Sequence, residues 1–175
     1  MSIPRIAWAA YGFALVVVIL DQITKAMILG SVDVSDPDLI RPGHVFAEII
    51  PGVLSFTMVR NTGVSFGLFG GGEARWFLSA FSIVVAGALA WWAMKAERRL
   101  LVTAIGLVIG GAIGNVIDRV RFGYVVDFID FSATGLFPWV FNVADSAITV
   151  GVALLILDSV MSERKPAVGA APEKA

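Results

Sequence analysis

Four long apolar segments, separated by shorter polar ones, dominate the chain and predict four membrane-spanning helices. They cover about residues 6–29, 75–94, 100–118 and 143–160. At roughly 1.5 Å per residue, a helix of about 20 residues crosses the ~30 Å hydrocarbon core of a bilayer. The apolar run at the start of the first segment is followed by Asp21-Gln22-Ile23-Thr24-Lys25, where a signal peptide would have a small-residue cleavage site. We therefore interpret the first segment as a retained helix.

The stretch from about residue 31 to 73 is the one long polar part between spans. Leu54–Arg60 and Val64–Phe69 resemble strands, and Asn61-Thr62-Gly63 resembles a turn between them. This pattern predicts a small β-hairpin or cradle element on the membrane surface. The fold class is thus an all-α membrane protein with a β element between the first and second helices. Residues 1–161 form a single domain in this interpretation, and 162–175 form a disordered tail.

Composition supports a membrane protein and excludes several kinds of site. Hydrophobic residues make up 58% of the chain and charged residues 15%, against about 25% charged in a typical soluble domain. The net charge of −1 offers no basic surface for nucleic acid. Without cysteine, and with His44 as the single histidine beside Pro42-Gly43 in an expected turn, the chain lacks the usual ligands of a zinc centre. We expect neither a metal nor a cofactor.

The distribution of basic residues predicts the orientation in the membrane. Four spans put both termini on one side, and this side carries seven Lys and Arg residues against six on the other. Three of the seven, Lys95, Arg98 and Arg99, lie in the shortest loop, which the positive-inside rule weights most. We therefore expect both termini in the cytoplasm and the 31–73 element on the periplasmic side.

Unusual polar residues converge near the outer ends of the predicted spans. They are Asp21 and Lys25 in the first span, Asn115, Asp118 and Arg119 at the end of the third, and Asn142 and Asp145 at the start of the fourth. The structural alternative is anchoring at helix ends, since Lys and Arg snorkel to the interface and a carboxylate such as Asp145 can cap a helix. Asp127, flanked by Val126 and Phe128, is explained least by structure alone.

Two carboxylates brought together at a membrane boundary have a chemistry available. Like charges in contact cannot both ionise easily, so the pair shares a proton and can activate water against an amide. A Ser/Lys mechanism with Lys25 and either Ser65 or Ser146 is a second possibility. A proton-coupled transporter or an assembly subunit without chemistry are alternatives from other classes.

Five ordered motifs resemble those of the bacterial lipoprotein signal peptidases, also called signal peptidase II. They are DQITK at 21–25, NTGVSF at 61–66, GGAIGNVIDR at 110–119, VVDF at 125–128 and FNVADS at 141–146. The resemblance implies an aspartyl endopeptidase of the inner membrane with its active site near the periplasmic face. Such an enzyme removes signal peptides from prolipoproteins by cutting before a cysteine that carries diacylglycerol. Prolipoproteins and membrane lipid are then its partners, and we expect a monomer.

The same resemblance assigns roles to individual residues. Asp127 and Asp145 match the two catalytic aspartates of the family. Substrate-binding or dyad-supporting positions are matched by Asn61, Asn115, Arg119, Asn142, Asp21 and Lys25, and structural motif positions by Gly63, Gly114 and Asp118. The chain departs from the family at Val64-Ser65, where two small residues are usual. The Phe137-Pro138-Trp139 loop is expected to contact the membrane surface.

Overall fold

The structure is a computed structural model, and it describes residues 5–63 and 73–163. The strand expected at Val64–Phe69, including the Val64-Ser65 departure, lies outside these residues. The expected tail also lies outside them from residue 164 onward. Ser162 and Glu163 still belong to the last helix, so the boundary at residue 162 is two residues too early.

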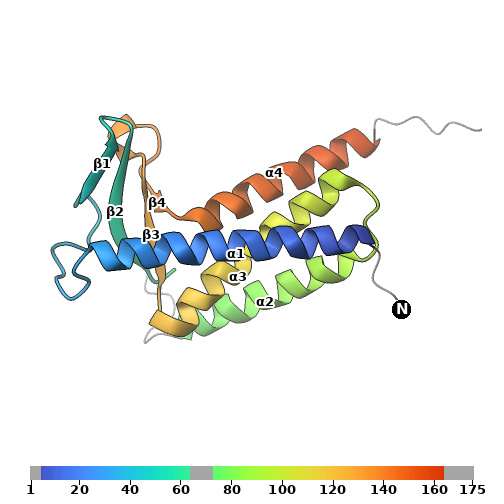
Figure 1. Cartoon of the computed structure of the whole chain (residues 1–175), viewed down its shortest axis with the longest axis horizontal. Helices are drawn as coiled ribbons and strands as arrows, with labels where there is room; N and C mark the ends of the chain where they lie inside the picture. Colours follow the sequence, from blue (N-terminus) through green and yellow to red (C-terminus); the bar gives the residue numbers. More distant parts are fainter. Residues whose placement is uncertain (1–4, 64–72, 164–175) are drawn as a thin grey trace, which may run out of the picture.

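In the part of the chain that the structure describes, four helices are long and apolar enough to cross a membrane, as predicted. They are α1 (Arg5–Ser31), α2 (Glu73–Ala93), α3 (Arg99–Phe122) and α4 (Val143–Glu163). The start of α1 and the end of α4 lie at the same end of the bundle (Figure 1). The chain therefore begins and ends its membrane-spanning part on one side.

The end of α3 lies four residues beyond its predicted boundary. The helix continues to Phe122, past the predicted end of the span at residue 118. Gly123 then takes a left-handed conformation with φ 84°, and its N–H donates to the carbonyl of Arg119. Glycine in this position commonly ends a helix, since it lacks the Cβ that makes positive φ costly.

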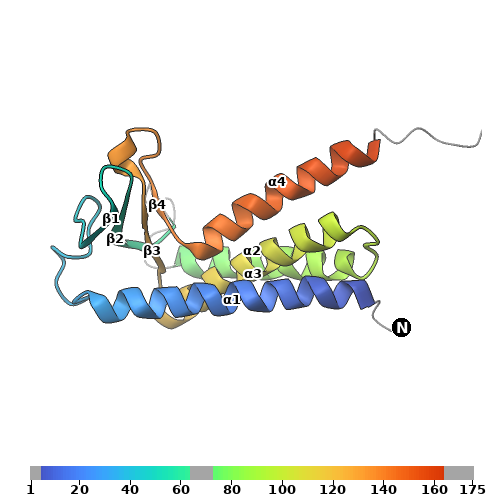
Figure 2. The ribbon, with the colours of Figure 1, turned by 45° about the horizontal axis from the view of Figure 1, so that its top comes forward.

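A four-stranded antiparallel sheet covers one end of the bundle. Its order is β1 (Ala47–Ile50), β2 (Leu54–Asn61), β3 (Val125–Asp130) and β4 (Val140–Phe141). The predicted strand at 54–60 is confirmed, but the described hairpin joins it to β1 through a turn at Gly52, with φ 71°. β3 and β4 come from the connection between α3 and α4, so the sheet is not confined to the segment between the first two helices. Figures 1 and 2 show its strands lying across the helix ends.

Helix α3 is the centre of the bundle. In α3, 72% of the most apolar 18-residue stretch is buried inside the protein, against 17–28% in the other three helices. Gly106, Gly110 and Gly114, spaced four residues apart, allow this burial: a Cβ added at Gly106 would lie 2.6 Å from the carbonyl oxygen of Ala10 in α1. Close backbone approach of this kind is how small residues promote helix association in membranes.

Apolar side chains attach the sheet to the outer end of α1. Ile28 of α1 and Val32, the residue after this helix, pack with Met58 of β2 and with Val126 and Phe128 of β3, all buried. Strand β3 is therefore buried on both faces along most of its length. Asp127 lies between Val126 and Phe128 in this strand, so its side chain points to the opposite face from theirs, where it is also buried.

Candidate active site

Asp127 lies in β3, between β2 and β4, and only 1% of its surface is exposed. Both carboxylate oxygens accept hydrogen bonds from side-chain amides. Asn61 Nδ2, at the end of β2, donates to Oδ2 at 2.8 Å, and Asn142 Nδ2 donates to Oδ1 at 2.7 Å. Antiparallel pairing of β2 with β3 brings Asn61 within reach of Asp127, although 66 positions separate them.

Asp145 lies in the first turn of α4, but it does not cap the helix with its own side chain. Asn142 Oδ1 accepts the Asp145 backbone N–H at 2.8 Å, which makes Asn142 the capping residue. The capping alternative for Asp145 is therefore wrong, and its carboxylate is available for other contacts. Asn115 Nδ2 of α3 donates to Asp145 Oδ1 at 2.8 Å.

Two amides connect the two acids. Asn142 Nδ2 also lies 3.2 Å from Asn115 Oδ1, so the Asn142 amide touches Asp127 and the Asn115 amide touches Asp145. This arrangement brings together Asn115, Asn142 and Asp145, whose convergence the topology predicted, with Asp127 and Asn61, which the resemblance alone assigned to the site. The two carboxylates thus belong to one hydrogen-bonded network built from β2, β3, α3 and α4.

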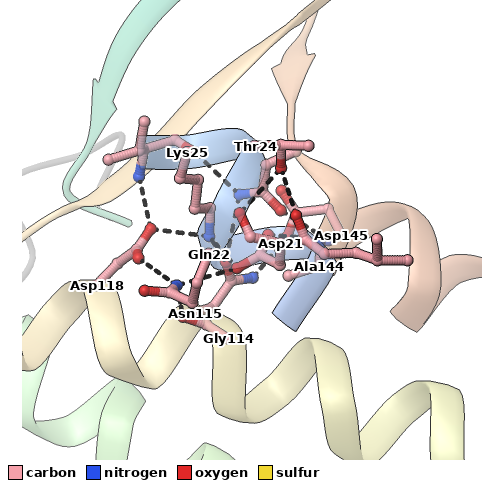
Figure 3. A network of polar contacts seen from close by, with 12 residues as sticks. Asp21, Gln22, Thr24, Lys25, Gly114, Asn115, Asp118, Ala144 and Asp145 are labelled. Carbon is pink, nitrogen blue, oxygen red and sulfur yellow. Dashed lines mark hydrogen bonds and ion pairs between the residues drawn. The ribbon is translucent and has the colours of Figure 1, made fainter. Parts of the chain in front are cut away.

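Asp21, Lys25 and Asp118 form a buried ionic cluster beside the amides (Figure 3). Lys25 Nζ lies 2.8 Å from Asp21 Oδ2 and 2.8 Å from Asp118 Oδ2, and all three side chains are at most 2% exposed. It also donates to Asn115 Oδ1 at 3.1 Å. The snorkelling alternative is wrong for these residues, because their charged groups point into the protein instead of toward the interface.

The Ser/Lys alternative finds no support in the described part of the chain. Lys25 Nζ contacts Asp21, Asp118 and Asn115, and none of these is a nucleophile of that type. Ser146 Oγ donates to the carbonyl of Asn142 at 2.9 Å, which occupies it within its own helix. Ser65 lies outside the described residues.

Arg119 and the two motif glycines adjoin the network. Arg119 is partly buried, and its Nη1 lies 3.5 Å from the carbonyl oxygen of Asn115. Gly63 has φ 78°, and its N–H donates to Asn61 Oδ1 at 2.8 Å, which orients the Asn61 amide. At Gly114 an added Cβ would lie 2.6 Å from Asp21 Oδ2, so only glycine leaves room for that carboxylate.

The surroundings of Asp127 raise the pKa of its carboxyl group to about 7. Burial is the largest cause, because it disfavours the charged form, and the nearby negative charge of Asp145 adds to it. The hydrogen bonds from Asn61 and Asn142 act in the opposite direction. A carboxyl group with this pKa keeps a proton for part of the time near neutral pH, as a proton donor in acid–base chemistry must.

Two cavities reach the acids from different sides. One of about 470 Å³ is lined by Asp145 together with the apolar side chains Phe131, Phe137, Phe141 and Val150. The other, of about 350 Å³, is lined by Asp127 with polar and aromatic groups that include Arg60, Asn61 and Trp139. The site thus offers an apolar cavity on the Asp145 side and a more polar one on the Asp127 side.

Sequence reasoning missed Gln22 and the Arg98–Asp158 pair. Gln22 Nε2 donates to Asp118 Oδ1 at 2.9 Å and lies 3.2 Å from Asp21 Oδ2, so it bridges the two carboxylates of the ionic cluster. Its place between Asp21 and Lys25 in the DQITK motif was the available signal. Asp158 is buried in α4 and pairs with Arg98 at 2.8 Å.

Comparison with known proteins identifies the family. Residues 13–161 match the family model described as signal peptidase (SPase) II. The chain is 53% identical over 165 residues to a lipoprotein signal peptidase of Caulobacter vibrioides, with 93% of each chain covered. It is 40% identical to that of Rhizorhabdus wittichii, with 91% of this chain and 90% of the relative covered.

Solved structures agree with this result. A bacterial membrane enzyme determined by the in meso method at 2.3 Å superposes with a TM-score of 0.72 at 32% identity, covering 95% of this chain and 93% of the other. A second, determined at 1.9 Å, has the same TM-score at 36% identity and covers 86% and 92%. The transporter and assembly-subunit alternatives are therefore replaced by a protease of the membrane. The chain belongs to the signal peptidase II family.

Proposed function

We propose that Asp127 and Asp145 form the catalytic dyad with which this chain removes signal peptides from prolipoproteins, the reaction of its family. The observation that carries the proposal is the shared network: both carboxylates are held by amides that also touch each other. An aspartic mechanism needs two acids in one network that share a proton, and the raised pKa of Asp127 fits that requirement.

The proposed chemistry uses one proton held between the two acids. The ionised carboxylate takes a proton from a water molecule, whose oxygen attacks the carbonyl carbon of the scissile amide. The protonated carboxyl group donates a hydrogen bond to the carbonyl oxygen and then gives its proton to the departing nitrogen as the C–N bond breaks. Asn61, Asn115 and Asn142 hold the carboxylates in place, and the partly buried Arg119 adds positive charge beside them.

The substrate in this proposal is a prolipoprotein whose cysteine carries diacylglycerol, and cleavage occurs on the N-terminal side of that cysteine. The apolar cavity next to Asp145 and the polar cavity next to Asp127 support a substrate with both lipid and peptide parts. The Phe137-Pro138-Trp139 loop, in which Trp139 is 67% exposed, is suited to contact with the membrane surface.

We place the enzyme in the bacterial inner membrane as a monomer, with both termini in the cytoplasm. The basic loop between α2 and α3, with Lys95, Arg98 and Arg99, supports this orientation by the positive-inside rule. The dyad, at the opposite end of the bundle, then faces the periplasm. The orientation can be tested with a thiol reagent that cannot cross the membrane. A single cysteine introduced at exposed Glu48 should react from outside the cell, and one introduced at Lys95 should not.

The decisive experiment measures cleavage of a diacylglyceryl-modified prolipoprotein by purified wild type, Asp127→Asn and Asp145→Asn. Each substitution keeps size and polarity but removes the acid, so we expect cleavage to fall by roughly 10³-fold or more while the fold survives. Wild-type cleavage should persist with a metal chelator present. Full activity of either folded variant would remove that residue from the dyad, and wild type that cuts no prolipoprotein would refute the function.

A further inference from the structure

The buried carboxylates of Asp21 and Asp118 each accept a backbone hydrogen bond from the residue that precedes one acid of the proposed dyad. The backbone N–H of Val126, the residue before Asp127, donates to Asp118 Oδ2 at 3.0 Å. The backbone N–H of Ala144, the residue before Asp145, donates to Asp21 Oδ1 at 2.9 Å. Each supporting carboxylate thus fixes the chain one position before an acid of the dyad.

One ammonium group joins these two supports. Lys25 Nζ lies 2.8 Å from a carboxylate oxygen of Asp21 and 2.8 Å from one of Asp118, and Figure 3 shows all three side chains meeting between α1 and α3. Gln22 Nε2 forms a second, neutral bridge between the same two carboxylates. Strand β3 and helix α4 are therefore connected through a chain of short polar contacts that passes through Lys25.

Burial makes this connection stiff. Asp21 and Asp118 are fully buried and Lys25 is 2% exposed, so each charge depends on its partners for stabilisation. Separating a buried ion pair leaves uncompensated charge at a cost of several kcal/mol. Small displacements of β3 relative to α4 are thus resisted, and a misplacement of about 1 Å in reacting groups can cost roughly 10²-fold in rate.

We propose that Asp118 and Asp21, bridged by Lys25, are positioning residues that set the separation of Asp127 and Asp145 by holding the backbone N–H before each of them. This inference rests on the proposed function and gives Asp118 a role beyond that of a structural motif position. None of the three residues lines either cavity of the site. They act on kcat through the geometry of the dyad.

The first test compares Asp118→Asn with Asp158→Asn in cleavage of the modified prolipoprotein. Asp158 is the control, because it is also buried and ion-paired at 2.8 Å, to the half-exposed Arg98 directly before α3, near the end of the bundle away from the ionic cluster. Both variants should lose thermal stability. We expect only Asp118→Asn to lower kcat, by roughly 10²-fold, with KM changed less than about threefold.

The second test moves a support without removing any charge. Gly114→Ala would place a Cβ 2.6 Å from Asp21 Oδ2, and Gly106→Ala would place one 2.6 Å from the Ala10 carbonyl oxygen in the same α1–α3 interface. The added Cβ at Gly106 meets backbone, which cannot rotate away, so this control disturbs packing at least as much, but only Gly114 adjoins the ionic cluster. We expect Gly114→Ala to lower kcat and Gly106→Ala to lower stability alone. This pair keeps the inference testable if Asp118→Asn does not fold.

The outcomes separate this inference from the proposed function. A kcat equal to that of wild type in folded Asp118→Asn or folded Gly114→Ala would overturn the positioning role. Equal losses of kcat in the controls Asp158→Asn and Gly106→Ala would overturn it too. In either case wild type still cleaves and Asp127→Asn does not, so the proposed function stands. If wild type cleaves nothing, the function itself fails.

Discussion

Asn142 Nδ2 lies 2.7 Å from Asp127 Oδ1, so the residue that caps α4 also holds the acid of strand β3. The other side of the same amide, Oδ1, accepts the backbone N–H of Asp145 at 2.8 Å. A single buried side chain therefore contacts both residues of the proposed dyad. Its capping and bridging roles can be separated by substitution.

Asn142→Ser should abolish most of the activity while leaving α4 intact. Serine is also a good N-cap, so the exchange of one capping residue for another should change the free energy of unfolding by less than about 1 kcal/mol. Its shorter side chain cannot reach Asp127, and we expect kcat to fall by roughly 10²-fold. Thermal unfolding and cleavage assays on the same preparation check both parts. A large drop in stability with unchanged kcat would contradict the bridging role.

The pH dependence of cleavage should reflect the proton held near Asp127. The pKa of this carboxyl group is about 7, so the dyad loses its shared proton and kcat declines as the pH rises above about 7. The hydrogen bond from Asn61 stabilises the ionised form and lowers this pKa. Asn61→Ala should therefore move the alkaline decline to higher pH. A decline that stays in place or moves to lower pH would show that Asp127 is not the titrating group.

The same pKa predicts that Asp127 makes stability depend on pH. A carboxyl group whose folded pKa is raised from 3.8 to about 7 retains a proton that the unfolded chain releases. Its contribution to stability is thus present below about pH 4 and is lost as the pH rises through about 7. Asp127→Asn should remove this loss, so its thermal midpoint in detergent should fall less between about pH 5 and about pH 8 than that of wild type.

Asp38→Asn serves as a control for that comparison. The Asp38 side chain is 83% exposed, so its removal should leave the pH dependence of the midpoint as in wild type. A wild-type midpoint that rises toward high pH, or an Asp127→Asn midpoint that follows wild type at every pH, would contradict the raised pKa.

Ser146→Ala should retain cleavage within about threefold of wild type. The hydroxyl donates only to the Asn142 carbonyl within α4 in the described structure, and such a bond contributes about 1 kcal/mol. Steady-state cleavage of the modified prolipoprotein is the measurement, with Asp145→Asn as the inactive comparison. Complete loss of activity in a folded Ser146→Ala would revive the Ser/Lys mechanism.

The sequence by itself determined the four spans and the place where chemistry gathers. Uninterrupted apolar runs are a local property, and their length against the bilayer predicts spans without knowledge of packing. The polar residues at the ends of these runs, such as Asp21, Asn115 and Asp145, converge once the topology is known. The glycine spacing of α3 is likewise a local property, and it favours close helix packing.

Other features depend on which segments meet, and only the tertiary structure decided them. Strand β3 pairs with β2 across more than 60 positions, and β4 pairs with β3. A short run such as VVDF carries no local sign of its partner. The cap of α4 comes from Asn142 and not from Asp145. Both types of side chain are compatible with a helix start. Sequence spacing could not distinguish them.

The ionic cluster shows the same division most clearly. The i, i+4 spacing of Asp21 and Lys25 predicted a pair, yet it equally fitted two groups snorkelling to the interface. Packing of α1, α3, α4 and β3 buries both residues against Asp118. The same packing brings the backbone N–H groups of Val126 and Ala144 within hydrogen-bond distance of the Asp118 and Asp21 carboxylates. Hydropathy and periodicity are local, whereas the partners of a buried charge are set by every segment that surrounds it.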